Sequence, residues 1–320
     1  MEVSPSSDLP SPARVVPGSR WAFAGDDPGA VPRRAAQGFR GLAVGTWALL
    51  IFGATVRVNG AGLSCPDWPL CFGRVIPQLN VQVALEWGHR VLAGSISTVF
   101  IGLGGLIWLR PELRARVGRL WGGAAVVLVA QIVLGGLTVL QLLAFWSVTL
   151  HLLTGNLFLL SLLLIADRLD PKPLSSSPVT RRLAGALLAM WFIQMALGGL
   201  VSSNHAGLAC TEWPTCNGGV WFPVMDGIVG LQLLHRLGAY IVFALCGALA
   251  WSARASEAAL LTQMTLVVVC VQVALGITNV FLALPVEVAV LHSATGDLLG
   301  ICAASTFLRV RASAAVQVAA

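Results

Sequence analysis

This chain of 320 residues has few charged side chains. Asp, Glu, Lys and Arg make up only 11% of it, while hydrophobic residues make up 57%. An ordinary soluble domain is about 25% charged and about 45–50% apolar. The composition therefore argues against a water-soluble fold. The net charge of +6 comes from basic residues placed between apolar runs, so we expect no nucleic-acid partner.

The apolar runs are long enough to cross a lipid bilayer, which takes about 20 residues of helix. We therefore predict an all-α integral membrane protein with eight transmembrane helices, surrounded by membrane lipid. The predicted spans are 41–57, 83–109, 119–141, 145–166, 182–203, 228–252, 258–281 and 286–309. An even number of spans places both termini on the same side of the membrane.

The segment 1–38 is rich in Pro, Ser and Gly and lacks the apolar stretch of a secretory signal peptide. We expect it to be a disordered cytoplasmic tail, with the first span acting as an uncleaved anchor. Arg and Lys recur in this tail, in the connections 110–119 and 168–182, and after the last span. Short cytoplasmic loops retain such residues, so both termini are expected in the cytoplasm of a multi-pass plasma-membrane protein.

The chain repeats itself. GAGLSCPDWPLC at 60–71 matches HAGLACTEWPTC at 205–216, and HLLTGNL from His151 matches HSATGDL from His292. The repeat predicts two tandem four-helix halves, 39–168 and 182–311, joined by a cytoplasmic linker (169–181) and followed by a cytoplasmic tail (312–320). Each half has an even number of spans, so the halves enter the membrane from the same side as parallel repeats.

Histidine is scarce, and four of the five histidines occupy matched repeat positions. These four are His89, His151, His235 and His292. All four are expected at one depth near the outer surface, where ionisable side chains are costly and usually functional. Two imidazoles from facing helices suit the axial positions of a heme iron. Hydrogen bonding between helices is the alternative, and zinc is disfavoured because no third ligand accompanies either pair.

Arg90 and Arg236 directly follow two of these histidines. A guanidinium at that place can bind heme propionates, or it can simply extend to the membrane boundary, and the sequence leaves both interpretations open.

The loops expected on the outer face each contain two cysteines separated by five residues, Cys65 with Cys71 and Cys210 with Cys216. Exported compartments permit disulfides, so we favour one within each loop. Free thiols and a redox pair that exchanges with a partner are the alternatives.

The two halves differ at one informative position. Glu86 lies three residues before His89, on the same helix face, whereas Gln232 holds the equivalent place before His235. A carboxylate near a heme ligand is costly unless it has a task such as proton transfer, although a group at the bilayer edge is the alternative. The asymmetry predicts one reactive heme and one that stores or relays electrons.

These residues resemble a known family. The Cys-Pro-Asp-Trp-Pro loop at Cys65, the EWGHR motif ending at Arg90, the HLLTG motif at His151 and their second-half counterparts look like heme A synthase over about residues 40–310. The resemblance implies an enzyme that oxidises the C8 methyl group of heme O to a formyl group, giving heme A for terminal oxidases. It also implies partners in heme O synthase and oxidase assembly, and an electron acceptor that the sequence does not identify.

Carried onto this sequence, the resemblance implies a division of roles. His89 and His151 would flank the substrate heme O, Glu86 would be the catalytic carboxylate, and His235 and His292 would ligate a heme b cofactor. The rival interpretations are a diheme electron-transfer protein similar to a cytochrome b, and a heme transporter. Glu86 favours the enzyme, because electron transfer alone requires no carboxylate at one heme.

Overall fold

The computed structural model describes residues 29–221 and 223–319, with side chains as far as residue 311. Within this part the chain forms eight long helices and one short 3-10 helix, and it has only isolated β-bridges. All eight long helices have the length and apolar composition to cross a membrane. The all-α, multi-pass prediction is confirmed.

The bounds of the helices are as follows: α1 Ala30–Val58, α2 Val81–Leu109, α3 Pro111–Leu140, α4 Phe145–Leu169, α5 Pro178–Ser203, η1 Ala206–Leu208, α6 Gly227–Ala253, α7 Ala259–Phe281 and α8 Val286–Ala319. Local sequence explains several starts. The Asn80 side chain accepts a hydrogen bond from the Val83 N–H (2.9 Å), and Ser177 does the same for Thr180 (3.1 Å). Short polar N-caps satisfy backbone N–H groups that have no partner within the helix.

Several helices run beyond the spans predicted from hydropathy. Residues 30–38, expected in the tail, belong to α1, and α8 continues through 312–319, where a tail was expected. The first 28 residues of the expected tail lie outside the described part. The stretch between α4 and α5 is only 170–177. The reason is that an apolar run in the sequence marks only the part of a helix that crosses the lipid. The backbone hydrogen bonds of the helix continue into its polar ends.

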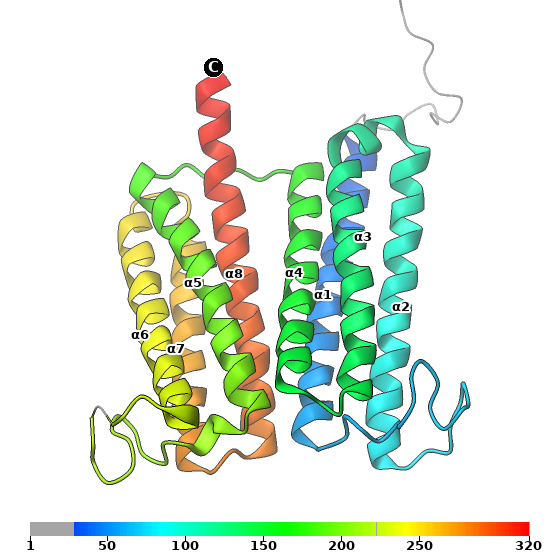
Figure 1. The fold of residues 1–320 in the computed structure, drawn as a ribbon. Coiled ribbons are helices and arrows are strands. Elements are labelled where there is room, and N and C mark those ends of the chain that lie inside the picture. The colour runs from blue at the N-terminus through cyan, green and yellow to red at the C-terminus, as the bar shows by residue number, and fades with distance from the viewer. Residues whose placement is uncertain (1–28, 222, 320) are drawn as a thin grey trace, which may run out of the picture.

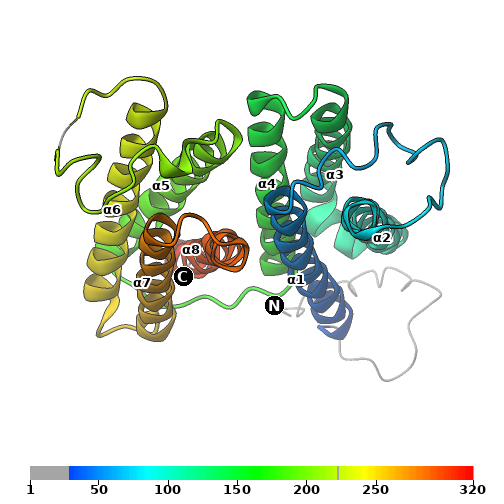
Figure 2. The same ribbon diagram turned by 90° about the horizontal axis from the view of Figure 1, so that it is seen from below.

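The helices form two groups, α1–α4 and α5–α8, which stand side by side (Figure 1). In each group every helix packs on two neighbours, and the groups meet through α1, α4, α5 and α8. Viewed from one end, α2 lies diagonally opposite α4, and α6 diagonally opposite α8 (Figure 2). The even-numbered helices of each group therefore face one another across the interior of the bundle.

Each group has its own apolar core. In the first, Phe100 stacks on Trp121 with ring centroids 5.3 Å apart and meets Phe158 edge-on at 5.2 Å. Between the groups, the Trp47 Nε1–H donates to the Ala294 carbonyl (3.0 Å). An indole that is half buried between helices needs such a partner.

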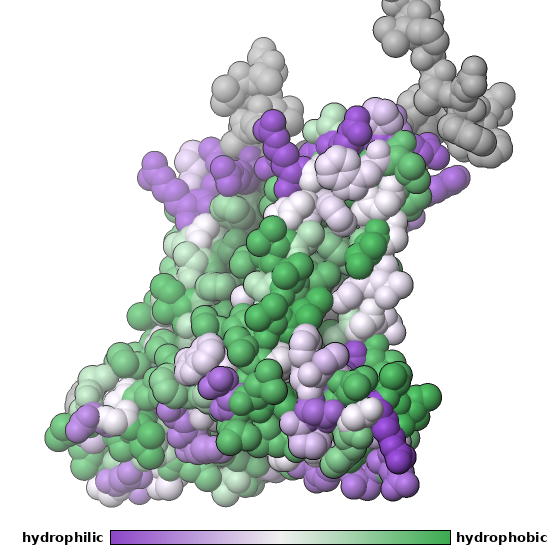
Figure 3. Space-filling model, turned by 45° about the vertical axis from the view of Figure 1, so that its right-hand side comes forward, coloured by the Kyte–Doolittle hydropathy of each residue, from purple (hydrophilic) through white to green (hydrophobic). Residues whose placement is uncertain are grey.

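The two ends of the bundle differ. The cysteine-containing connections 59–80 and 204–226 lie at one end, which we call the loop end (bottom of Figure 1). The opposite end, with the connection 170–177, is the arginine end, and it carries Arg168, Arg181, Arg182, Arg254 and Arg311. Between them the surface is mainly hydrophobic, with hydrophilic residues gathered at both ends (Figure 3). A belt of this kind matches a surface in contact with lipid.

Candidate functional site

The structure places the four repeated histidines at matching positions. His89 and His235 lie about two turns into α2 and α6, and His151 and His292 lie nearly two turns into α4 and α8. All of these helices start at the loop end. In each group the two rings come from diagonal helices and are within electrostatic range of each other. The sequence prediction of two histidine pairs near one end is consistent with this placement.

A glycine of the preceding helix makes room for each histidine ring. A Cβ on Gly53 would lie 3.1 Å from Cε1 of His89, and one on Gly135 would lie 3.0 Å from Cε1 of His151. The second half repeats the arrangement with Gly198 against His235 (3.2 Å) and Gly276 against His292 (3.1 Å). Any larger residue would have to displace the imidazole. Four glycines thus fix where four rings can lie.

Several ring nitrogens lack a protein partner. The Nδ1 atoms of His89, His151 and His292 are buried and have no hydrogen bond. Burying a polar atom without a partner costs free energy, so these imidazoles are suited to an additional ligand. Among the described residues no group of three or more His, Cys, Asp and Glu is placed to hold a metal ion. Paired imidazoles without a third protein ligand fit the axial positions of a heme iron.

The second pair is held by more hydrogen bonds than the first. The Gln194 side chain lies 3.0 Å from Nδ1 of His235 and donates to the His235 carbonyl (2.9 Å). When Gly53 is aligned with Gly198, the position of Gln194 corresponds to Leu49, which has no such group. The other histidine of each pair has the same neighbour in both halves. Nε2 of Gln131 lies 3.4 Å from Nε2 of His151, and Nε2 of Gln272 lies 3.3 Å from Nε2 of His292. The two sites therefore differ in how firmly one ring is oriented.

A disulfide closes each loop. Cys65 is bonded to Cys71 and Cys210 to Cys216, the pairing favoured by the sequence, and all four residues are buried. An acidic side chain between each pair of cysteines, Asp67 or Glu212, binds the turn that follows the second one.

The two acidic residues do this in the same way. Asp67 accepts hydrogen bonds from the Phe72 and Gly73 N–H groups at 2.7 and 2.8 Å. Glu212 accepts from the Gly218 and Gly219 N–H groups. The bond from Gly73 lowers the pKa of Asp67, and the bond from Gly219 lowers the pKa of Glu212. Both turns are therefore fastened by carboxylates that stay charged at neutral pH.

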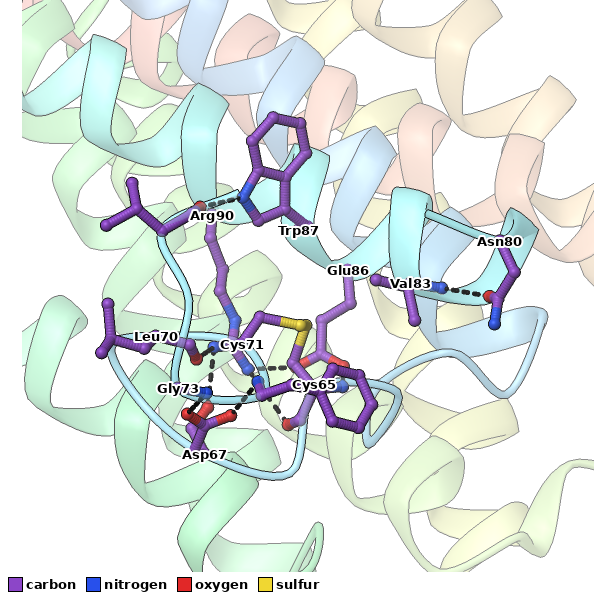
Figure 4. The surroundings of a disulfide bond; sticks show 12 residues. Cys65, Asp67, Leu70, Cys71, Gly73, Asn80, Val83, Glu86, Trp87 and Arg90 are labelled. Atoms are coloured by element: carbon purple, nitrogen blue, oxygen red, sulfur yellow. Dashed lines mark hydrogen bonds and ion pairs between the residues drawn. A yellow bond between two sulfur atoms is a disulfide. The ribbon is translucent and has the colours of Figure 1, made fainter. Parts of the chain in front are cut away.

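Arg90 and Arg236 bind the backbone of these loops. Arg90 donates to the carbonyls of Asp67 (2.8 Å) and Leu70 (2.7 Å), as Figure 4 shows. Arg236 donates to the carbonyls of Thr215 and Cys210, both at 3.0 Å. Neither guanidinium extends freely to the membrane boundary. Each one ties a histidine-bearing helix to a disulfide loop, and contact with propionates stays a prediction.

Glu86 lies between the first loop and the first histidine pair. Its side chain accepts a hydrogen bond from the Cys65 N–H (2.7 Å) and forms an ion pair with Arg90 (2.5 Å). Only 4% of Glu86 is exposed, so the alternative of a surface group at the bilayer edge is wrong. Gln232 instead donates to the Gly207 carbonyl (3.2 Å), and its Oε1 is buried without a partner. The carboxylate is a feature of the first half alone.

Comparison with known proteins gives the family. Residues 40–85 and 78–303 match the COX15-CtaA family, described as cytochrome oxidase assembly protein. The chain belongs to this family. Over 300 residues it is 30% identical to the heme A synthase of Shewanella oneidensis, covering 79% of this chain and 90% of the relative. The heme A synthase of Sinorhizobium fredii is 29% identical, over 78% of this chain and 82% of the relative.

The structure of this COX15-CtaA member adds residues that the sequence reasoning missed. Trp68 of the first loop packs against α3, where a Cβ on Gly136 would lie 3.0 Å from the indole. Gly136 follows the glycine that seats His151, so the loop reaches over the first site. The second half has Ile277 in place of Gly136. Aligning the LGGL segment of α3 with the LGIT segment of α7 would have revealed both the shared glycine and this difference.

Proposed function

We propose that this chain is a heme A synthase, which oxidises the C8 methyl group of heme O to a formyl group and so supplies heme A to terminal oxidases. The observation that carries the proposal is the duplicated histidine pair, seated on glycines between diagonal helices. It is supported by membership in the COX15-CtaA family and by relatives that bear the name heme A synthase.

The two halves divide the work. His89 and His151 flank the substrate heme O, while His235 and His292 hold a resident heme b. The extra hydrogen bonds from Gln194 to His235 orient one ring of the second pair before anything binds, as suits a cofactor that stays. Leu49 at the equivalent place leaves His89 without that constraint, as suits a site that must admit and release a molecule. When bound, heme b supplies a route for electrons.

Turning a methyl into a formyl group removes electrons and protons and adds an oxygen atom. Glu86 is placed to receive a proton, because its carboxylate lies on the same helix face as His89 and one turn closer to the loop end. Arg90 and the Cys65 N–H hold the carboxylate in place. Trp68 of the same loop packs on Gly136, next to the glycine that contacts His151. A carboxylate held in a fixed position is what proton transfer by a side chain requires.

We place the loop end on the outer face of the plasma membrane and the arginine end in the cytoplasm, because cytoplasmic connections retain Arg and Lys. The disulfides support this orientation, since they persist in oxidising compartments. The partners in this setting are heme O synthase, which supplies the substrate, oxidase assembly, which takes the product, and an electron acceptor of unassigned identity.

The direct test is to co-express the chain with a heme O source in a host that makes no heme A of its own. Extracted hemes are then separated by chromatography and identified by mass spectrometry. We expect heme A to appear only when both proteins are present. Heme O recovered unchanged under aerobic conditions, with the second heme fully bound, would instead support the electron-transfer or transporter interpretation.

The glycine seats give a steric test of the heme b site. Gly276→Leu is expected to push the His292 ring from its place, because even a Cβ there would lie 3.1 Å from Cε1. Heme b per protein, measured from the reduced-minus-oxidised visible spectrum, should fall about tenfold or more. Gly247→Leu is the matched control, since a Cβ at Gly247 meets no atom within 4 Å. Equal heme content in the two variants would contradict the proposal that His292, packed against Gly276, binds heme b.

A further inference from the structure

A hollow of about 380 Å³ opens between α5 and α8 at the arginine end. Its lining is Pro178, Arg181, Arg182, Phe307 and Arg311. Pro178 is the first residue of α5, and Arg311 lies in the last part of α8 at the same end of the bundle, so the hollow lies at the end where the arginines gather. Three guanidinium groups and an aromatic ring thus surround one space at the level of lipid headgroups.

The first half has different charges at the corner that corresponds to this hollow. Aligning His151 with His292 puts Asp170 at the place of Arg311, and aligning Gly53 with Gly198 puts Arg40 at the place of Gly185. Arg40 and Asp170 form an ion pair there at 2.8 Å. In the second half an arginine replaces the aspartate and a glycine replaces the arginine. The same corner of the fold is neutralised in one half and left cationic in the other.

The arginines of the hollow have no acidic partner among the residues whose side chains the structure describes. In the described part of the chain no ion pair includes Arg181, Arg182 or Arg311. Arg181 donates to the Ser176 carbonyl (3.0 Å), and Arg311 lies over the Phe307 ring, 5.6 Å from its centroid. Arg182 is exposed. The guanidinium groups of Arg182 and Arg311 are therefore available to bind an anion, next to the apolar ring of Phe307.

We propose that this hollow binds the phosphate headgroup of an anionic phospholipid. Guanidinium groups bind phosphate through paired N–H donors, and basic pockets between transmembrane helices on the cytoplasmic side bind such headgroups. Phe307, one turn from Arg311 toward the bilayer interior, lies where the first part of an acyl chain would pass. The lipid would bridge α5 and α8 and stabilise the second half. This proposal is independent of the heme chemistry.

The test uses the purified heme-loaded full chain and the midpoint of thermal unfolding as a function of added short-chain phosphatidylglycerol. We expect a saturable rise in the midpoint with phosphatidylglycerol and none with short-chain phosphatidylcholine or inorganic phosphate. The double variant Arg182→Gln with Arg311→Gln should bind phosphatidylglycerol about thirtyfold more weakly. Arg116→Gln with Arg119→Gln, which removes the same charge from the arginine end of α3, should leave the affinity unchanged.

A second variant gives the hollow the acidic residue found at the matching place in the first half. Arg311→Asp copies Asp170 and should abolish the phosphatidylglycerol response while heme content stays at the wild-type level. The proposal is overturned if phosphatidylcholine acts as well as phosphatidylglycerol, or if phosphate alone reproduces the rise. It is equally overturned if the Arg116 and Arg119 control loses as much affinity as the hollow variant, because general surface charge would then account for the binding.

Discussion

Replacing Glu86 with Gln should lower the yield of heme A about a hundredfold or more, the usual contribution of a positioned acid or base. The substitution keeps the shape of the side chain, and its amide oxygen can still accept the Cys65 N–H that Glu86 now binds at 2.7 Å. What disappears is the charge, and with it the ion pair to Arg90. Extracted hemes should then contain heme O or a partly oxidised product in place of heme A.

Glu86 also fastens the first loop, so the experiment must separate anchoring from chemistry. Heme b content should stay at the wild-type level in Glu86→Gln, and peptide mapping should still recover the Cys65–Cys71 disulfide. Arg90→Gln provides the complement, because it removes the cation that holds the loop carbonyls but keeps the carboxylate. We expect it to retain more activity than Glu86→Gln. Wild-type heme A yield from Glu86→Gln would refute the proton-transfer role.

The second half supplies a matched control. Gln232 occupies the place of Glu86 but donates to the Gly207 carbonyl and pairs with no cation. Gln232→Glu introduces a carboxylate at the matching place of the second half, four residues before Arg236 as Glu86 is before Arg90. The heme A yield should be unchanged, because we propose that the substrate binds in the other half. A rise in yield would show that the second pocket also accepts substrate.

Sequence reasoning reached the eight helices and the repeated histidines because both leave direct traces in the residue order. Apolar runs of sufficient length predict membrane helices, and matched motifs predict matched depths, as for His89 and His235. It could not place the helix ends, since the polar first turns of α1 and α3 carry no hydropathy signal. Residues 30–38 were therefore expected to be unstructured, whereas they form the first part of α1.

The arginines show where such reasoning stops. The spacing of Arg90 and Arg236 from the histidines suited either propionate binding or extension to the membrane boundary. In the structure both bind loop carbonyls, which depends on how the disulfide loops fold back over the helix ends. That fold arises from contacts distant in sequence, such as Asp67 with the Gly73 N–H and Trp68 with Gly136. No local sequence pattern predicts those contacts, although Asp67 and Glu212 occupy matched positions in the repeat.

Replacing His292 or His235 with Ala should remove the low-spin heme b spectrum of the purified protein. No other histidine can take over, because the chain has five in all, two of them in the first half and His205 in a loop. His205 is exposed and precedes the short helix η1, so His205→Ala should keep the full spectrum and serves as the control. Each variant is examined by reduced-minus-oxidised spectroscopy and by heme extraction.

A rescue experiment separates loss of a ligand from loss of the fold. His292→Gly leaves a space beside Gly276, where the imidazole ring now lies 3.1 Å from the position of a Cβ. Added imidazole should enter that space and restore a low-spin spectrum, because it returns the missing nitrogen without the backbone link. The same addition to Gly276→Leu should restore nothing, since there the leucine occupies the space itself. An unchanged heme b spectrum in both His235→Ala and His292→Ala would instead place the heme elsewhere in the chain.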